Sequence, residues 1–333
     1  MKKIINEPED FVDDMLAGVL SAHGDQLTNV ENNNRNIVRA NWKDKVALVS
    51  GGGSGHLPLF MGYVGKGLLD GCAVGGVFQS PSVNQIYDIT KKVDSGKGVV
   101  YIYGNYTGDT MNFEMSSEMA DIDGIKTAHV VGNDDVASAP KGEEQKRRGV
   151  AGIFFIYKTA GAAAEAGASF DEVVRIANKA KANIRTIGVA LSPCIIPEVG
   201  KPSFTIADDE MEIGMGIHGE PGVKKTKIQK ANILVAHIMN TILTDMELEE
   251  GCEASVLVNG LGATPKEELY IVWREIAQIL AVKKVKVFHV YVGEFATSME
   301  MAGFSISVFK LDDELKMLLR AEARTPFFEQ IAY

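Results

Sequence analysis

One histidine of this chain is framed by glycines. The stretch 214–222 reads Gly-Met-Gly-Ile-His-Gly-Glu-Pro-Gly and places four glycines and a proline around His218. Such a frame exposes an imidazole to a small ligand without crowding it. A neutral imidazole nitrogen is a nucleophile, and a ketone has no leaving group, so its addition product would be a reversible hemiaminal. We therefore interpret His218 as a covalent handle for a carbonyl compound.

The same stretch also matches the spacing G-x-G-x-x-G of dinucleotide sites. That motif should follow an apolar strand and open a helix. Here four acidic residues at 208–212 precede it and Pro221-Gly222 follows. The context therefore excludes the dinucleotide interpretation. The remaining alternative is a histidine in a glycine-rich surface turn.

Two further polar loops follow apolar strands. The predicted strand 45–50 runs into Gly-Gly-Gly-Ser-Gly-His at 51–56, which lacks the Lys-Ser/Thr ending of a phosphate-binding loop. Its backbone N–H groups beside His56 suit a small ligand rich in oxygen. The predicted strand 98–103 runs into 104–109, where Asp109 could orient or deprotonate a substrate hydroxyl. The alternative role of Asp109 is to cap the helix that follows.

The elements that must position these loops predict an α/β protein with two domains. Strand, loop and helix alternate through residues 1–183, which predicts a doubly wound, largely parallel sheet. An alanine-rich helix pair near 150–182 ends this domain. Residues 184–333 should form a second α/β domain, a mixed sheet with helices that carries the His218 loop. A chain of 333 residues is long enough for two cores.

Composition limits the partners of the protein. A formal charge of −10 argues against direct binding of nucleic acid, which requires clustered lysine and arginine. We find no apolar stretch long enough to span a membrane and no signal peptide, so we expect a cytoplasmic protein. The cysteines at 72, 194 and 252 lack metal-ligand spacing, and we interpret them as buried thiols. We expect neither a metal nor a resident cofactor.

Several long motifs resemble the dihydroxyacetone kinase family, specifically its ketone-binding subunit, nearly from end to end. They occur in the family's order at 50–56, 105–109, 147–152, 200–204, 216–222 and 259–265. The resemblance implies a homodimer of two α/β domains that binds dihydroxyacetone, or a related short ketose, as a hemiaminal on His218. It implies that His56 and Asp109 contact the substrate hydroxyls and accept protons. It also implies that Gly53, Ser54, Gly55 and Gly104 line the pocket.

The chain departs from that subunit at two positions. Leu57 stands where the family usually has glutamate, and Gly104 stands where it usually has lysine. A lost lysine removes a donor and a charge, which bears more on phosphoryl transfer than on capture of the ketone. Some members with the same Tyr-Gly-Asn-Tyr sequence resemble kinases for related short ketoses.

Two functions remain open. We interpret the protein as a ligand-sensing coactivator, in which capture of the ketone stabilises one conformation that a transcriptional regulator recognises. The alternative is the ketone-binding subunit of a kinase, which presents the substrate hydroxyl to a separate nucleotide-binding donor subunit. His56 and Asp109 favour the enzyme, whereas Leu57 and Gly104 favour the sensor. In neither case is the chain a complete kinase, because no nucleotide or metal motif is visible.

Overall fold

The chain forms two six-stranded sheets, and this computed structural model describes residues 2–41 and 44–333. The first sheet has the order β1-β2-β4-β3-β5-β6. Its strands are β1 (Leu27–Val30), β2 (Asn33–Arg39), β3 (Ala47–Ser54), β4 (Gly71–Val77), β5 (Val99–Gly104) and β6 (Thr127–Gly132). The helices of this half are α1 (Phe11–Ala22), α2 (Val83–Val93), α3 (Thr107–Ile122), α4 (Ile153–Glu165) and α5 (Phe170–Ala182), with short 3-10 turns η1 (Pro8–Asp10), η2 (Phe60–Tyr63) and η3 (Glu144–Lys146).

The first sheet is buried on both faces. Strands β4, β3, β5 and β6 are parallel, while β1 and β2 add an antiparallel edge. Along β5, Val100 and Ile102 pack on the side of α4 and α5, whereas Val99 and Tyr101 pack on the side of α2 and α3. This alternation explains the almost continuous apolar run of the strand, because both of its faces contact helices. The predicted doubly wound, largely parallel sheet is confirmed.

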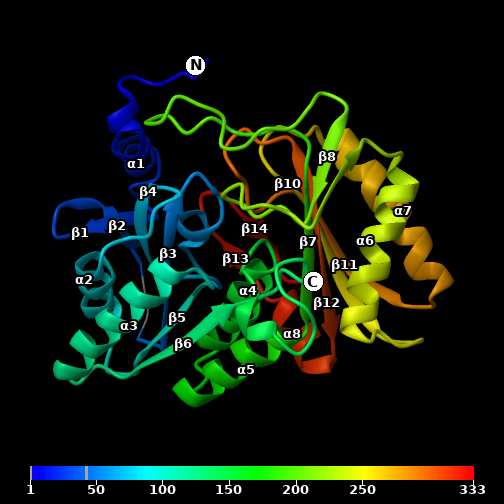
Figure 1. Ribbon diagram of the computed structural model, residues 1–333. Coiled ribbons are helices and arrows are strands. Elements are labelled where there is room, and N and C mark those ends of the chain that lie inside the picture. Colours follow the sequence, from blue (N-terminus) through cyan, green and yellow to red (C-terminus); the bar gives the residue numbers. More distant parts are fainter. Residues whose placement is uncertain (1, 42–43) are drawn as a thin grey trace.

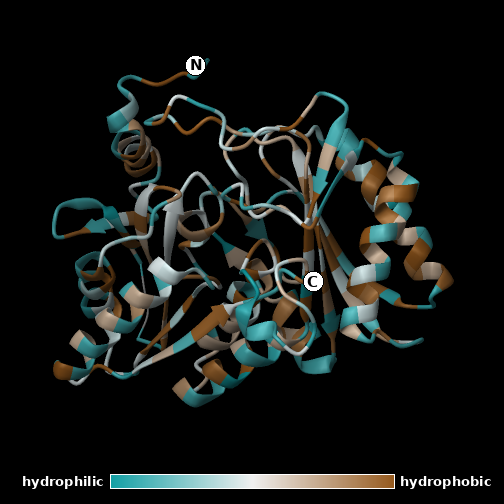
Figure 2. Cartoon of the chain, in the orientation of Figure 1, coloured by the Kyte–Doolittle hydropathy of each residue, from teal (hydrophilic) through white to brown (hydrophobic). Residues whose placement is uncertain are grey.

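The second sheet is mixed, as predicted. Its order is β11-β10-β12-β7-β8-β9, and only β10 and β11 pair in parallel. Helices α6 and α7 cover its outer face with apolar residues toward the sheet, and their solvent side also carries exposed apolar residues, namely Ile233, Tyr270, Ile271 and Val282 (Figures 1 and 2). No helix of the described ranges is long and apolar enough to cross a membrane. The elements are β7 (Ile184–Ala190), β8 (Glu210–Ile213), β9 (Lys224–Lys227), α6 (Ala231–Met246), β10 (Glu253–Gly260), α7 (Lys266–Val282), β11 (Lys286–Glu294), β12 (Gly303–Leu311) and α8 (Asp313–Arg320), followed by the short pair β13 (Ala323–Arg324) and β14 (Glu329–Gln330).

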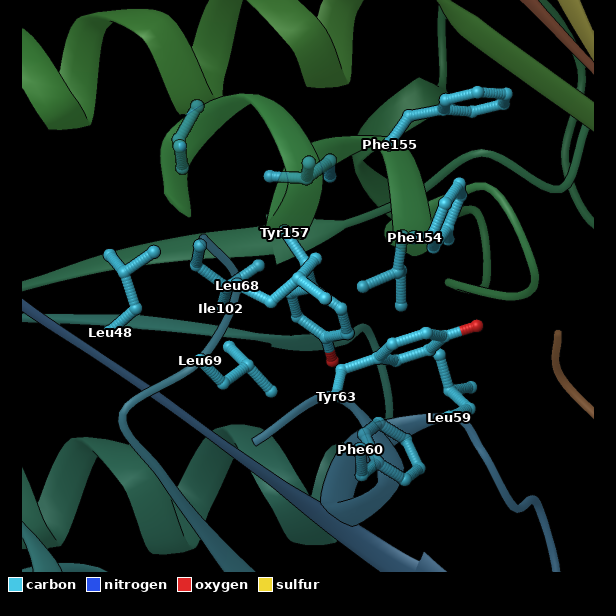
Figure 3. Close-up of a cluster of buried hydrophobic side chains, with 14 of the residues drawn as sticks. Leu48, Leu59, Phe60, Tyr63, Leu68, Leu69, Ile102, Phe154, Phe155 and Tyr157 are labelled. Carbon is cyan, nitrogen blue, oxygen red and sulfur yellow. The ribbon is translucent and has the colours of Figure 1, made fainter. Parts of the chain in front are cut away.

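Helix α4 joins the cores of the two sheets. Every residue from Ile153 to Ala164 is buried, and the helix lies between the sheets in Figure 1. The ring of Phe154 lies 5.4 Å from that of Tyr63 and 5.1 Å from that of Tyr291 in β11. Figure 3 shows the side of this cluster formed by Phe154, Tyr157 and Tyr63. Because one helix packs against both sheets, their relative placement depends on the core. The predicted division into residues 1–183 and 184–333 stays a prediction.

The structure differs from expectation at two features. Strand β3 continues to Ser54, so the glycines expected to start a loop at Gly51 still pair with β4. Gly52 has no room for a side chain, because a Cβ there would lie 2.4 Å from the ring of Phe60. The prediction of three buried thiols is wrong for Cys252, which is partly exposed, and correct for the cysteines at 72 and 194.

A buried lysine lies in the middle of α4. Lys158 is fully buried, and its Nζ donates a hydrogen bond of 3.2 Å to the carbonyl oxygen of Leu318. Burial lowers the pKa of this amine to about 8, because the charged form loses its hydration. The protonated amine therefore costs stability at neutral pH.

Replacing Lys158 by methionine tests this cost. The folded pKa lies below the unfolded value of 10.5. The unfolded chain therefore binds more protons between these values, and wild-type stability rises with pH in that window. At pH 7 we expect Lys158→Met to raise the free energy of unfolding by roughly 1–3 kcal/mol. Urea unfolding should show a smaller gain in the free energy of unfolding at pH 10 than at pH 7. A gain of the same size at both pH values, or a variant less stable than wild type at both, would contradict the account.

Candidate functional site

Three segments that are distant in the sequence meet between the two sheets. His56 follows β3, Asp109 lies in the first turn of α3, and His218 lies in the loop between β8 and β9. The ring centroids of His56 and His218 are 4.7 Å apart, with an interplanar angle of 75°. The structure therefore brings together the two histidines that were selected from the sequence.

The imidazole of His218 is oriented by Glu220. The Nδ1 atom of His218 lies 2.8 Å from Oε1 of Glu220, and its backbone N–H donates to Oε2 at 2.9 Å. Burial alone would raise the pKa of Glu220, but the hydrogen bond and charge of His218 and the charge of Arg148 lower it to about 2. Because an ionised carboxylate only accepts hydrogen bonds, Nδ1 must carry the proton. In the neutral imidazole the lone pair of His218 is then on Nε2, which is the arrangement that a nucleophile requires.

The glycines of this loop make room for the carboxylate. A Cβ at Gly216 would lie 2.1 Å from Oε2 of Glu220 and 2.5 Å from Nη1 of Arg148. Arg148 also donates to Oδ2 of Asp135 at 2.9 Å and to the carbonyl oxygen of Gly214 at 2.8 Å. This arginine thus ties the His218 loop to the segment that follows β6. Its motif was recognised in the sequence, but its place beside Glu220 was not predicted.

His56 is held by the loop between β11 and β12. Its buried Nδ1 lies 2.7 Å from the carbonyl oxygen of Thr297, and a carbonyl oxygen can only accept, so Nδ1 donates. Its Nε2 is buried and has no partner among the described residues. Burial, together with charge on His218, lowers the pKa of His56 to about 3. His56 is therefore neutral, with an unused acceptor on Nε2.

Asp109 is a second unused acceptor. It is buried, and its Oδ1 has no partner among the described residues. Burial raises the pKa of this carboxyl to about 6, against the opposing effects of a hydrogen bond to Ser80 and of charge on His218. Helix α3 begins after Tyr106 without a side-chain cap. The alternative role of Asp109 as a helix cap therefore does not apply.

The segment before His56 has little conformational freedom. Gly55 has a φ of +100°, and a Cβ there would lie 2.8 Å from the ring of Phe78. A Cβ at Gly53 would lie 2.7 Å from the backbone of Phe78, and the backbone N–H of Phe78 donates to the carbonyl oxygen of Ser54 at 3.1 Å. Phe78 also stacks on His56, with ring centroids 4.9 Å apart at 18°. Its role could not be predicted, because a lone phenylalanine after a strand carries no signal.

Gly104 ends β5 close to the same site. A Cβ at this position would lie 2.8 Å from the ring of Tyr106, and that ring lies 4.6 Å from the ring of His218. The role of Gly104 in the pocket wall stays a prediction. Within the described ranges, no group of three His, Cys, Asp or Glu residues is placed to hold a metal ion.

The sequence of this chain is similar to those of known proteins over nearly its whole length. A family model described as the Dak1 domain matches residues 17–327. The PTS-dependent dihydroxyacetone kinase 2, dihydroxyacetone-binding subunit DhaK, of Listeria innocua serovar 6a is 46% identical over 331 residues, 99% of each chain. The D-erythrulose kinase of Mycolicibacterium smegmatis is 41% identical and aligns with 99% of this chain and 57% of its own. Among solved structures, the dihydroxyacetone kinase operon co-activator Dha-DhaQ has a TM-score of 0.88 at 31% identity, over 96% of this chain and 97% of its own.

Removing the charge of Asp109 should stabilise the protein. Its folded pKa of about 6 lies above the unfolded value of 3.8. The folded state therefore binds more protons between these values, and wild-type stability falls as pH rises through that window. At pH 7 we expect Asp109→Asn to raise the free energy of unfolding by roughly 1–3 kcal/mol, and below pH 4 by little or nothing.

Denaturant unfolding at pH 7 and pH 3.5 measures this difference. Asp121→Asn is the matched control, because Asp121 is exposed on the same helix. It should change stability little at either pH. If Asp109→Asn is less stable than wild type at pH 7, the Asp109 carboxylate of the wild-type protein has a stabilising partner, and the account is wrong.

Proposed function

The chain belongs to the Dak1 domain family, and from this membership we propose that it binds a short ketose, such as dihydroxyacetone, as a hemiaminal on His218. The observation that carries the proposal is the hydrogen bond between Nδ1 of His218 and Glu220. It leaves the lone pair on Nε2, the atom that must attack a carbonyl carbon. The names of relatives such as the dihydroxyacetone-binding subunit from Listeria support this choice of ligand.

The addition step needs only groups of this site and a proton. The lone pair of Nε2 forms the bond to the carbonyl carbon, and the π electrons of the carbonyl move to its oxygen, which takes a proton. The imidazole gains a positive charge that faces the carboxylate of Glu220. Nothing leaves, so the reverse reaction returns the intact ketose.

His56 and Asp109 are proposed to bind the hydroxyl groups of the ketose. Both side chains are buried, and one acceptor atom of each has no partner among residues 2–41 and 44–333. A hydroxyl proton would satisfy each of these atoms. Of the two, Asp109 is the better base, because its pKa is about 6 whereas that of His56 is about 3. We assign to Asp109 the removal of the proton from the reacting hydroxyl. We assign to His56 the alignment of that hydroxyl. Gly53, Ser54 and Gly55 would form the adjoining wall.

For the cellular role we propose the ketone-binding subunit of a dihydroxyacetone kinase. The relative with 46% identity over 99% of both chains is named as such a subunit. In that role the chain presents the hydroxyl, and a separate nucleotide-binding subunit supplies the phosphoryl group. Phosphoryl transfer depends mainly on positioning and charge, which fits a site of two acceptors around a covalent anchor. A homodimer in the cytoplasm is part of this proposal.

The coactivator that was favoured from the sequence is the second candidate. The co-activator structure matches this chain over 96% of its length, so this fold also occurs in a protein named as a co-activator. Leu57 and Gly104 remain the residues that favour it. Under this alternative, the same adduct would select the state that a transcriptional regulator binds.

Intact-protein mass spectrometry tests the covalent anchor. Wild-type protein incubated with dihydroxyacetone and trapped at low temperature should gain the mass of one intact ketose per chain. His218→Ala should lose this gain completely, because it removes the nucleophile. The matched control is His237→Ala, since His237 is exposed on α6, and it should behave as wild type. An adduct of unchanged yield on the His218 variant would refute the assignment.

Reconstitution separates the two roles. We expect the protein, mixed with the nucleotide-binding subunit and phosphoryl donor of a PTS-dependent dihydroxyacetone kinase, to produce ketose phosphate over many turnovers. Asp109→Asn should reduce the turnover rate by about a hundredfold or more, the typical loss for a missing general base. Capture of the ketose without turnover, together with ligand-dependent binding of a transcriptional regulator, would refute the kinase role and support the coactivator role.

A further inference from the structure

The loop between β11 and β12 is hydrogen-bonded to the backbone on both sides of His56. The N–H of Thr297 donates to the carbonyl oxygen of His56 at 3.2 Å. The hydroxyl of Thr297 lies 3.0 Å from the carbonyl oxygen of Leu57 and 3.3 Å from that of Gly55. The N–H of Met299 also donates to the carbonyl oxygen of Gly55, at 2.8 Å. Thr297 therefore contacts three consecutive residues of the chain around His56.

The same residue holds the side chain of His56. The carbonyl oxygen of Thr297 accepts the proton of Nδ1 at 2.7 Å. The contacts to the backbone fix where the imidazole begins, and this hydrogen bond fixes the rotation of the ring. A neutral imidazole has one acceptor nitrogen, so the two kinds of contact together set the direction of Nε2.

The loop is held in turn by Asn259, a buried residue of β10. Its Oδ1 accepts hydrogen bonds from the backbone N–H groups of Phe295 at 2.8 Å and Ala296 at 2.9 Å. Its Nδ2 donates to the carbonyl oxygen of Ala296 at 2.9 Å and to Oγ of Ser305 at 3.0 Å. The polar atoms of this amide are therefore all paired, and they tie the loop to an inner strand of the second sheet. Thr297 is thus supported by a rigid element.

From these contacts we propose that Thr297 is a positioning residue, which holds the imidazole of His56 with Nε2 directed toward a hydroxyl of the ketose. Its hydroxyl fixes the backbone of residues 55–57, and its carbonyl group fixes the ring. Because the carbonyl belongs to the backbone, the hydroxyl is the part that a substitution can remove. The proposal rests on the role proposed for His56 and deepens it.

A series of substitutions at position 297 tests the hydroxyl. Thr297→Ala should weaken the capture of ¹³C-labelled dihydroxyacetone roughly threefold to tenfold, the range expected for one lost hydrogen bond. Thr297→Val, which fills the space without a hydroxyl, should show the same loss. Thr297→Ser keeps the hydroxyl and should restore capture. Wild-type capture by the alanine and valine variants, or a serine variant as impaired as they are, would overturn the proposal.

Thr159→Ala is the matched control for the loss of a buried hydroxyl. Thr159 is buried in α4, and its hydroxyl also donates to a backbone carbonyl oxygen, that of Phe155 at 2.9 Å. This variant should capture the ketose as wild type does. A loss equal to that of Thr297→Ala would mean that any buried hydroxyl of the core has this effect, and the positioning role would be wrong.

A double-mutant cycle separates positioning from a general structural role. If Thr297 acts through the imidazole, Thr297→Ala should weaken capture in the wild-type background and leave it unchanged in the His56→Ala background. A residue that only supported the fold would weaken capture equally in both backgrounds. Equal losses would therefore overturn the proposal.

A measurement without ligand distinguishes this proposal from the proposed function. In protein labelled with ¹⁵N-histidine, NMR reports how fast the Nδ1 proton of His56 exchanges with water. Exchange should be slow in wild type and Thr297→Ser and roughly tenfold faster in Thr297→Ala, because the weakened contact opens more often. Equal rates in the three proteins would overturn the positioning role even if the ketose is captured. The expected rates without capture by wild type would instead refute the adduct and leave the positioning role standing.

Discussion

The carboxylate of Glu220 accepts hydrogen bonds from both the ring and the backbone of His218, and the chemistry of the site depends on this contact. It decides which nitrogen of the imidazole keeps a lone pair, and it places a negative charge where addition to a carbonyl creates a positive one. Several features serve that contact. Gly216 has no side chain that would occupy the place of the carboxylate, and Arg148 stabilises its charge from 4.0 Å.

The rest of the site is built from polar groups whose burial is unfavourable. His56 and Asp109 each keep one buried acceptor that has no partner in the part of the chain that the structure describes, and the pKa of each is shifted so as to disfavour its charged form. Such groups reduce the stability of the folded protein until a ligand hydroxyl pairs with them. Their cost is tolerated because the surrounding core is extensive, with α4 buried along its length between the two sheets. In the proposed function, a hydroxyl group of the ketose would pair with each of these acceptors.

The two proposed roles share this ketone site and differ in what happens afterwards. Covalent capture needs the imidazole, its carboxylate and the hydroxyl acceptors, and all of these lie within one chain. Turnover needs a phosphoryl donor, and regulation needs a protein that recognises the occupied state. A family that contains both kinase subunits and a co-activator can therefore keep the same interior while its surface partners change.

The sequence alone was sufficient to predict the α/β class, the parallel first sheet and the mixed second sheet, because strand periodicity and strand–loop–helix order are local signals. The local frames of His56, Asp109 and His218 were visible for the same reason. It could not show that β3 continues through its glycines, since strand pairing and the ring of Phe60 decide this. Nor could it assign Tyr106, Phe78, Arg148 or Thr297 to the site. Those residues act through contacts between segments far apart in the chain, and only the packing of the two sheets around α4 brings the segments together.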